Sequence, residues 1–372
     1  MAADATQRIS LVLSGGGVRA MVFHLGALHY LAEHEALEQV DRISSVSGGS
    51  LLVGLILQRS GLRWPGSAEF LSTTYLGLRA QLCSSSLQWA AARQLLNPLN
   101  WRFLLSRANL LALALRDEWG VQARLADLPA KPEWSINGTT AETGKRFRFK
   151  ADSIGDYLLG HARPLEFPLA SALAVSAALP GGFGPLTLGA NRFAWQRRPN
   201  WGAPVSAIEP VEPMYRRLHL YDGGVYDNLG LEPYFDAGIG APKDPGHFLL
   251  VSDAGAPLPA GFSYLALNPW RLKRVADIMS DQSRALRVRT FVHFLKRNPQ
   301  AGAYLFIGSK TRSGLEATER SHPARFATTL RRLTLGEFDA LAEHGHHVAH
   351  AVHAEFGIHA IQRHAAPAGS AA

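Results

Sequence analysis

Two segments near the start of the chain share one pattern: a short β-friendly run ends in small residues and leads directly into an apolar helix. The first run, residues 10–13, ends in a glycine-rich turn at 14–17 and leads into a helical pattern over 19–34. The second, residues 41–46, ends at Ser47-Gly48-Gly49 and leads into another apolar helix. Strands that alternate with helices in this way predict an α/β fold with a buried parallel sheet. Because parallel strands end at one edge of a sheet, we expect the two turns to lie close together.

The rest of the chain continues this pattern around one long helical stretch. Residues 67–119 have helical periodicity and no strand signal, so we expect a helical insertion that packs on the core or caps a site. Further strand-like runs occur at residues 134–140, 145–150, 217–221 and 247–252, and a last helix is expected at 336–356. We predict a single domain over 7–357, with a central mostly parallel sheet and helices on both faces. A disordered tail is predicted at 358–372.

Composition narrows the location and the partners. The 38 basic residues exceed the 30 acidic ones, which gives a net charge of +8 and favours an anionic partner. Because no basic run is interleaved with aromatic residues, we expect no nucleic acid and favour an anionic membrane surface. No signal peptide or bilayer-spanning stretch is apparent, and Cys83 is the single cysteine. We therefore expect a cytoplasmic protein with peripheral membrane contact, and the sequence leaves its oligomeric state open.

Ser47 is the candidate nucleophile. It lies between a predicted strand and a predicted helix, where a sharp turn can lift a serine hydroxyl above the edge of the sheet. The G-x-S-x-G pattern needs small residues two positions before and after the serine. Gly49 satisfies this requirement, whereas Ser45 satisfies it less well than glycine would.

Three consecutive glycines at positions 15–17 precede Arg19. At the start of a helix, such a run lets several backbone N–H groups face one concavity, where the helix dipole adds positive potential. The loop can therefore hold the oxyanion of an acyl-transfer intermediate or, in the alternative, a phosphate group. The nucleotide-binding alternative requires an acidic residue at the end of the second strand, where Ser47 is found.

Asp222 follows the strand-like run at 217–221 and begins an Asp-Gly-Gly sequence. A carboxylate at this strand end can lie beside Ser47 and accept its proton as an ester is attacked. Asp-Gly is also a common turn sequence, and Asp227 is the nearest alternative carboxylate.

Together these three motifs resemble the patatin-like phospholipase family. The matching residues are Gly15, Gly16, Gly17 and Arg19, then Ser47 with Gly49, then Asp222-Gly223-Gly224. The resemblance covers residues 9–256 and implies a three-layer α/β fold with a helical insertion. It also implies a lipid acyl-ester hydrolase without metal or organic cofactor, with phospholipids or lysophospholipids as the first expected substrates. Ser45 and Ala20 depart from the family pattern, and neither removes a reacting group.

The resemblance implies a role for each of these residues. Ser47 and Asp222 would form a catalytic dyad without histidine and act through an acyl-enzyme. Arg19 would brace the glycine loop rather than react. The oxyanion would be held by backbone amides of Gly15, Gly16, Gly17 and Gly48.

The sequence also allows other interpretations. A triad that includes His247 or His322 requires a serine turn after several strands, whereas Ser47 follows only the second. His346 and His350 could chelate a metal, but we expect the histidines of the last helix to form a solvated face. A nucleotide-binding protein and a catalytically degenerate family member are the remaining alternatives.

Overall fold

A central run of five parallel strands forms the middle of one large sheet. The computed structural model describes residues 7–180, 182–199, 204–258, 260–262, 270–309, 323–359 and 361. Within them the parallel strands are ordered β14-β13-β1-β2-β3. Their bounds are β1 (Ile9–Leu13), β2 (Val40–Ser45), β3 (Glu133–Thr140), β13 (Phe248–Asp253) and β14 (Gly302–Phe306).

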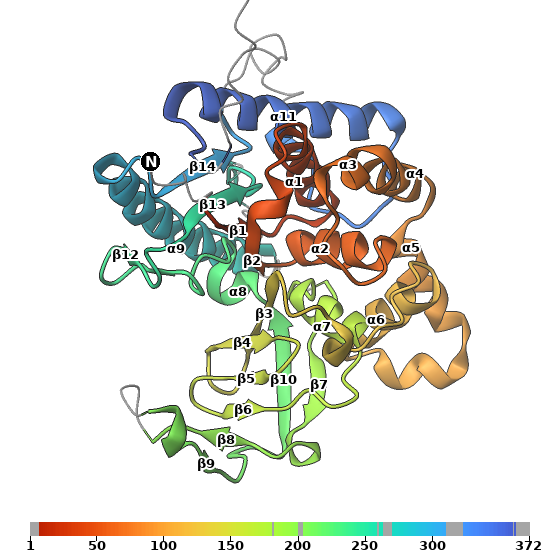
Figure 1. Cartoon of the computed structure of the whole chain (residues 1–372). Coiled ribbons are helices and arrows are strands. Elements are labelled where there is room, and N and C mark those ends of the chain that lie inside the picture. Colours follow the sequence, from red (N-terminus) through yellow and green to blue (C-terminus); the bar gives the residue numbers. More distant parts are fainter. Residues whose placement is uncertain are drawn as a thin grey trace, which may run out of the picture.

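Antiparallel strands extend the sheet from β3 and lie below the parallel part in Figure 1. One series continues β3-β4-β5-β6-β8-β9, while β10 pairs with both β3 and β7. These strands are β4 (Arg146–Phe149), β5 (Ile154–Asp156), β6 (Gly160–Ala162), β7 (Leu186–Gly189), β8 (Gln196–Arg197), β9 (Glu209–Pro210) and β10 (Arg217–Asp222). A separate small sheet joins β11 (Phe235–Asp236) to β12 (Ala241–Pro242). The expected α/β fold is confirmed.

Helices cover both faces of the parallel strands, as the alternation of side chains along β1 demonstrates. Leu11 and Leu13 pack in the main core with α1 (Gly17–Glu33), α2 (Gly48–Arg59), α7 (Leu169–Ser176) and α11 (Leu335–Phe356). Val12 points the other way and packs with Phe291 of α9 (Trp270–Arg297), near the short α8 (Gly224–Asp227). Side chains alternate across a strand, so each face of the sheet has its own apolar cover.

Helix α1 is buried around almost its whole circumference, as its apolar sequence predicts. The sheet covers one side of α1 and α11 covers the other (Figure 1). The two helix backbones touch at two glycines. A Cβ at Gly26 would lie 1.9 Å from the Ala342 carbonyl oxygen, and one at Gly345 would lie 2.1 Å from the Phe23 carbonyl oxygen. Their relative position is therefore fixed by direct backbone contact.

The described residues of the predicted insertion form helices and no strand. They are α3 (Ser67–Glu69), the π-helical turn η2 (Phe70–Thr74), α4 (Tyr75–Ser84), α5 (Leu87–Arg93), the 3-10 turns η3 (Gln94–Leu96) and η4 (Pro98–Phe103), and α6 (Ala108–Asp117). No described helix is long and apolar enough to cross a membrane. In the predicted tail, Ile358 and Ile361 are buried against the core, while residues 360 and 362–372 lie outside the described residues.

Candidate active site

Ser47 lies in the sharp turn between β2 and α2. Its backbone has φ 50° and ψ −118°, a conformation that few residues other than glycine adopt. This geometry is typical of serine turns that expose a nucleophile. The glycine loop lies directly against the turn, because a Cβ at Gly48 would be 2.2 Å from the Gly17 carbonyl oxygen. The two motifs are thus held together by backbone contact.

A chain of buried hydroxyls supports the turn from beneath. The Ser47 amide donates to Ser176 Oγ at 3.0 Å, and the Ser176 hydroxyl donates to the Asn137 carbonyl oxygen at 2.8 Å. Ser50 Oγ lies 2.9 Å from Ser176 Oγ and 2.8 Å from Ser45 Oγ. Because the Ser176 proton is already donated, Ser50 must donate to Ser176 and Ser45 to Ser50. The departure from glycine at position 45 therefore has a structural use.

Asp222 lies at the end of β10, within reach of Ser47. Its side chain is 2% exposed, and its Oδ1 accepts a hydrogen bond from the Gly224 amide at 2.7 Å. The Ser47 hydroxyl is a further hydrogen-bond partner of this carboxylate. Burial raises the pKa of Asp222 to about 7, against the opposing effect of the Gly224 and Ser47 hydrogen bonds, which favour the ionised form. A carboxylate with this pKa can take up and release a proton near neutral pH.

The glycine loop leaves only part of its amides for a ligand. The Gly15 amide donates to the Asn228 carbonyl oxygen at 3.0 Å, so the expectation that Gly15 is an oxyanion donor is wrong. Gly15 instead provides room, because a Cβ there would lie 3.1 Å from Ser47 Cβ. Within the described part of the chain, the amides of Gly16, Gly17 and Gly48 donate to no protein acceptor.

Arg19 holds the loop from behind. Its guanidinium donates to the carbonyl oxygens of Ala254 at 3.1 Å and Phe326 at 2.6 Å, and to Thr328 Oγ1 at 3.1 Å. The side chain is almost fully buried, and this burial lowers the pKa of Arg19 to about 10. Arg19 therefore remains charged at neutral pH. Its hydrogen bonds connect α1 to the segment at Ala254 and to the segment at residues 326–328.

The rival acids and bases are occupied elsewhere. Asp227 accepts the amides of Leu229 and Glu232 at 3.1 and 3.0 Å, which shapes the loop after α8. His247 precedes β13 at the amino edge of the sheet and contacts Asp41 at 3.0 Å. This is the edge opposite to Ser47, so a triad through His247 is excluded. His322, the second candidate for a triad, lies outside the described residues.

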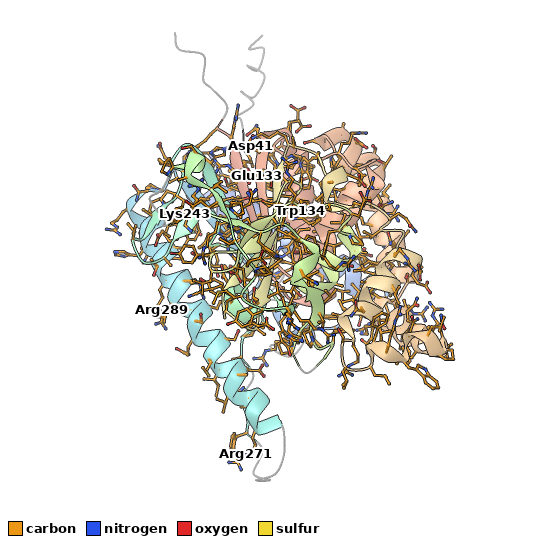
Figure 2. The ribbon with its side chains drawn as sticks, turned by 90° about the horizontal axis from the view of Figure 1, so that it is seen from below. Asp41, Glu133, Trp134, Lys243, Arg271 and Arg289 are labelled. Carbon is orange, nitrogen blue, oxygen red and sulfur yellow. The ribbon has the colours of Figure 1, made fainter. Side chains whose placement is uncertain are left out.

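At the amino ends of the parallel strands, the edge opposite to Ser47, the side chains form ion pairs. Asp41 at the start of β2 and Glu133 at the start of β3 lie close together in Figure 2, in agreement with the pairing of Arg42 and Glu133 in neighbouring strands. A hollow of about 740 Å³ opens there, and Lys131 and Arg8 in its wall both pair with Asp41, at 2.8 and 3.6 Å. Neither Ser47, Asp222 nor the glycine loop lines this hollow.

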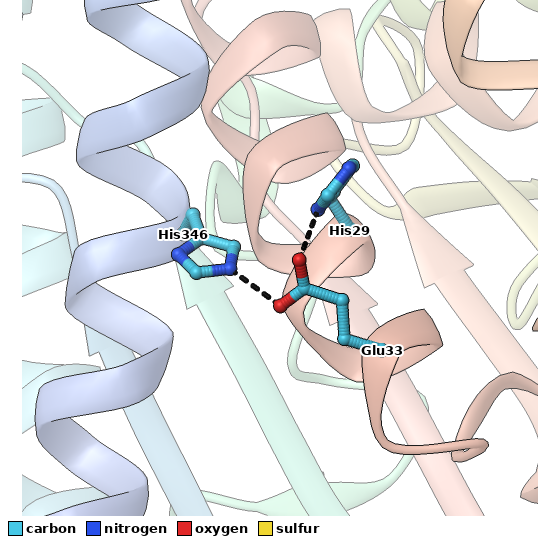
Figure 3. A group of neighbouring side chains, drawn as sticks. All are labelled: His29, Glu33 and His346. Carbon is cyan, nitrogen blue, oxygen red and sulfur yellow. Dashed lines mark hydrogen bonds and ion pairs between the residues drawn. The ribbon is translucent and has the colours of Figure 1, made fainter. Parts of the chain in front are cut away.

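The histidines of α11 differ from the expected solvated face. His347 and His350 are exposed as predicted, but the prediction is wrong for His344, which is buried and contacts the Ile307 carbonyl oxygen at 2.7 Å. His346 does not pair with His350. It contacts Glu33 of α1 at 2.7 Å, because the close crossing of the two helices brings α1 within reach (Figure 3).

Three residues near the site were not assigned a role from the sequence. Ser176 receives the Ser47 amide, Asn228 receives the Gly15 amide, and the Thr329 carbonyl oxygen receives the Val18 amide at 2.9 Å. Ser176 lies within residues 9–256, over which the sequence resembles the family, but it belongs to none of the three motifs. Thr329 carries no motif, and only the fold brings it over the glycine loop.

Comparisons with known proteins agree with the fold. No curated protein sequence matches the chain at a significant level. The structure of human GIVD cytosolic phospholipase A2 is similar, with a TM-score of 0.54 at 15% identity over 93% of this chain and 58% of that one. The complex of that human enzyme with methyl gamma-linolenyl fluorophosphonate and terbium chloride gives a TM-score of 0.51 at 14% identity, over 93% and 57%. This chain thus spans less than two thirds of either structure.

The sequence itself carries the family assignment. The profile of the patatin-like phospholipase family matches residues 11–234, which is more than half of the chain and includes the glycine loop, the serine turn and Asp222. The low identity to the human enzyme restricts that likeness to the fold. On the strength of the profile match, the chain belongs to the patatin-like phospholipase family.

Proposed function

We propose that this protein hydrolyses acyl esters of lipids, with Ser47 as nucleophile and Asp222 as general base. Family membership supports the reaction class, and phospholipids or lysophospholipids are the first substrates to test. The observation that carries the residue assignment is the buried Asp222 carboxylate hydrogen-bonded to the Ser47 hydroxyl, next to glycine amides.

The first half of the reaction would form an acyl-enzyme. Ser47 Oγ attacks the ester carbonyl carbon and gives its proton to Asp222, while the carbonyl oxygen becomes an oxyanion. The amides of Gly16, Gly17 and Gly48 are the donors available to hold this charge. The intermediate then collapses, the carbon–oxygen bond to the alcohol breaks, and the leaving alcohol takes the proton from Asp222.

The second half would release the fatty acid. A water molecule gives a proton to Asp222 and attacks the acyl carbon, and a second oxyanion forms. When this intermediate collapses, Ser47 Oγ leaves and recovers the proton from Asp222. One carboxylate thus serves as base and acid in turn, and a pKa near the working pH suits both steps.

We propose further that the segment from α5 through η3 and η4 to residue 105 brings the protein to an anionic membrane surface. Large apolar side chains are exposed along this segment, with Trp89 68% and Leu105 92% exposed. The full set, called the apolar patch below, is Trp89, Leu96, Leu99, Trp101, Leu104 and Leu105. Between positions 87 and 109 the charged residues are three arginines, and no acidic residue occurs. Apolar side chains with basic neighbours are suited to an anionic lipid surface.

Two connections join the apolar patch to the site. The Gln88 amide donates to the Leu330 carbonyl oxygen at 3.0 Å, and Leu330 follows Thr329, which lies over Gly17. Ser106 Oγ donates to the Pro185 carbonyl oxygen at 2.6 Å, in the chain that leaves α7 after Ser176. A membrane bound by the patch would therefore lie near the groups that react with the ester.

Fatty-acid release from phospholipid vesicles tests the function. The wild-type protein should release fatty acid, and Ser47→Ala should reduce the rate by at least about 10⁴-fold. The matched control is Ser72→Ala, an exposed serine in the insertion, which should retain full activity. Nucleotide-dependent thermal stabilisation that persists in Ser47→Ala would favour the nucleotide-binding alternative. No release from any lipid ester would favour a degenerate family member.

Vesicle binding tests the membrane proposal separately. Replacing both Trp89 and Trp101 by alanine should weaken binding to anionic vesicles by about tenfold or more, because two large apolar side chains lose their lipid contact. Hydrolysis of a water-soluble short-chain ester should not change. Ile239→Ala is the control, since Ile239 is 80% exposed and closely precedes β12, which lies on the opposite side of Figure 1 from α5. Equal weakening by both variants would contradict a role for the patch.

A further inference from the structure

A cluster of metal-ligand side chains lies where α1 and α11 cross, away from the site of ester hydrolysis. His29 and Glu33 are one turn apart on α1, and His346 comes from α11 (Figure 3). One ligand atom from each residue lies within 4.8 Å of the other two. His29 Nδ1 is 3.3 Å from Glu33 Oε1, and His346 Nε2 is 2.7 Å from Glu33 Oε2.

These distances suit one small divalent ion. In a tetrahedral zinc site with bonds of about 2.0–2.1 Å, neighbouring ligand atoms are roughly 3.3 Å apart. The His29–Glu33 separation of 3.3 Å equals that value and the His346–Glu33 separation of 2.7 Å is shorter, so modest rotation of the side chains would place all three ligand atoms around an ion. Two imidazoles and one carboxylate form a ligand set that zinc takes in proteins.

The surrounding structure holds the ligands in place. Gly345, next to His346, lies against the α1 backbone at Phe23, and Gly26 lies against α11 less than one turn before His29. The His29 ring packs edge-on against Tyr75 with 4.7 Å between ring centres. The three side chains are 28–40% exposed, which leaves an ion a path from solvent and room for a water ligand.

We infer that His29, Glu33 and His346 form a zinc-type divalent metal site that clamps α1 to α11. The site lies near the carboxyl end of α1, and the glycine loop lies at the amino end. Because the twelve residue-to-residue steps from Gly17 to His29 span roughly 18 Å of helix, the ion would stabilise the fold without touching the ester. This inference does not depend on the proposed function.

Metal binding to the tag-free, chelator-treated full chain tests the inference. Calorimetric titration with Zn²⁺ should give one ion per chain, and Co²⁺ should give the visible absorption bands of a four-coordinate site. Zn²⁺ in hundredfold excess over Kd should raise Tm by roughly 3 °C. Glu33→Gln and His346→Gln should each weaken binding at least about tenfold.

The matched control is His350→Gln, one turn further along α11. His350 is exposed and lies outside the cluster, so this variant should bind the ion within about twofold of wild type. Absence of zinc binding would overturn the inference, as would unchanged binding in Glu33→Gln and His346→Gln or equal loss in His350→Gln. A merely hydrogen-bonded cluster would lose stability on substitution with no response to the ion. Ester hydrolysis by Glu33→Gln should match wild type, which separates this test from that of Ser47.

Discussion

Each edge of the parallel sheet carries an aspartate, and the surroundings of the two aspartates shift their pKa values in opposite directions. At the amino edge, Asp41 is partly buried, which alone would raise its pKa, but hydrogen bonds from Lys131 and His247 lower it. At the carboxyl edge, Asp222 is buried, and among the described residues its carboxylate has only the Gly224 amide and the Ser47 hydroxyl as partners; its pKa is raised to about 7. Pairing with cations keeps a carboxylate ionised and inert, whereas burial without a cation makes it a usable base.

The largest expected difference between the two edges is in the rate of ester hydrolysis after each aspartate is replaced by asparagine. Asp222→Asn should reduce ester hydrolysis by about 10³-fold, because an amide cannot accept the Ser47 proton. Asp41→Asn should keep the rate within about threefold of wild type, since its partners lie at the other edge. Steady-state rates on a soluble ester measure both. A similar loss in the two variants would contradict the distinction.

The pH dependence of ester hydrolysis should follow the ionisation of Asp222 at the carboxyl edge. Only ionised Asp222 can act as base, so kcat/KM should rise about tenfold per pH unit below about 7 and level off above it. The rate at pH 5 should thus be about a hundredth of that at pH 8. A profile that is flat from pH 5 to 8 would show that another group accepts the proton.

Asp222 and Asp41 should affect the pH dependence of the free energy of unfolding in opposite directions. The folded-state pKa of Asp222 lies above its ordinary value of 3.8, so the folded protein loses stability as pH rises from about 4 to 7. Asp222→Asn should therefore raise the free energy of unfolding at pH 8 by about 2 kcal/mol, roughly 30-fold in the folding equilibrium.

Asp41 is the contrasting case. Its folded-state pKa is lowered, so its contribution is present at neutral pH and is lost as pH falls through that pKa. Asp41→Asn should destabilise the protein at pH 8. Urea unfolding of both variants at pH 5 and 8 measures the difference, and destabilisation by Asp222→Asn at pH 8 would contradict the assignment.

The hydroxyl chain beneath Ser47 should have a smaller effect. Ser176→Ala removes the acceptor of the Ser47 amide and should lower kcat about tenfold with little change in KM, because the turn is less firmly held. Ser72→Ala, which is exposed, is the control. An unchanged kcat would show that the strained turn holds Ser47 without this bond.

Much of the carboxyl edge could be predicted because its information is local. The strands and helices around Gly16 and Ser47 are set by apolar runs and small-residue turns, so β1, α1, β2 and α2 lie close to their predicted positions. The closeness of the glycine loop to Ser47 was predicted from the rule that parallel strands share an edge. The pairing of Ser47 with Asp222 was implied only by the family resemblance, because β10 runs antiparallel to β3 and that rule does not apply to it.

What could not be predicted depends on contacts between distant segments. Thr329 covers Gly17, and His346 reaches Glu33 across two helices, although neither pair is signalled by local spacing. Residues 154–156 form strand β5 of only three residues, too short for a periodic pattern to indicate. The glycine run and the family resemblance predicted Gly15 as a donor, whereas the hydrogen bond from its amide to Asn228 depends on a contact between distant segments.

Labelling with a fluorophosphonate probe, followed by mass-spectrometric mapping of the modified residue, tests the central claim most directly. The probe phosphonylates a serine only when a base activates it and an oxyanion hole receives the phosphoryl oxygen. The account predicts a single label on Ser47 in the wild-type protein, and at least about 10²-fold slower labelling in Asp222→Asn. A label on any other residue, or labelling of Ser47 at an unchanged rate in Asp222→Asn, would contradict it.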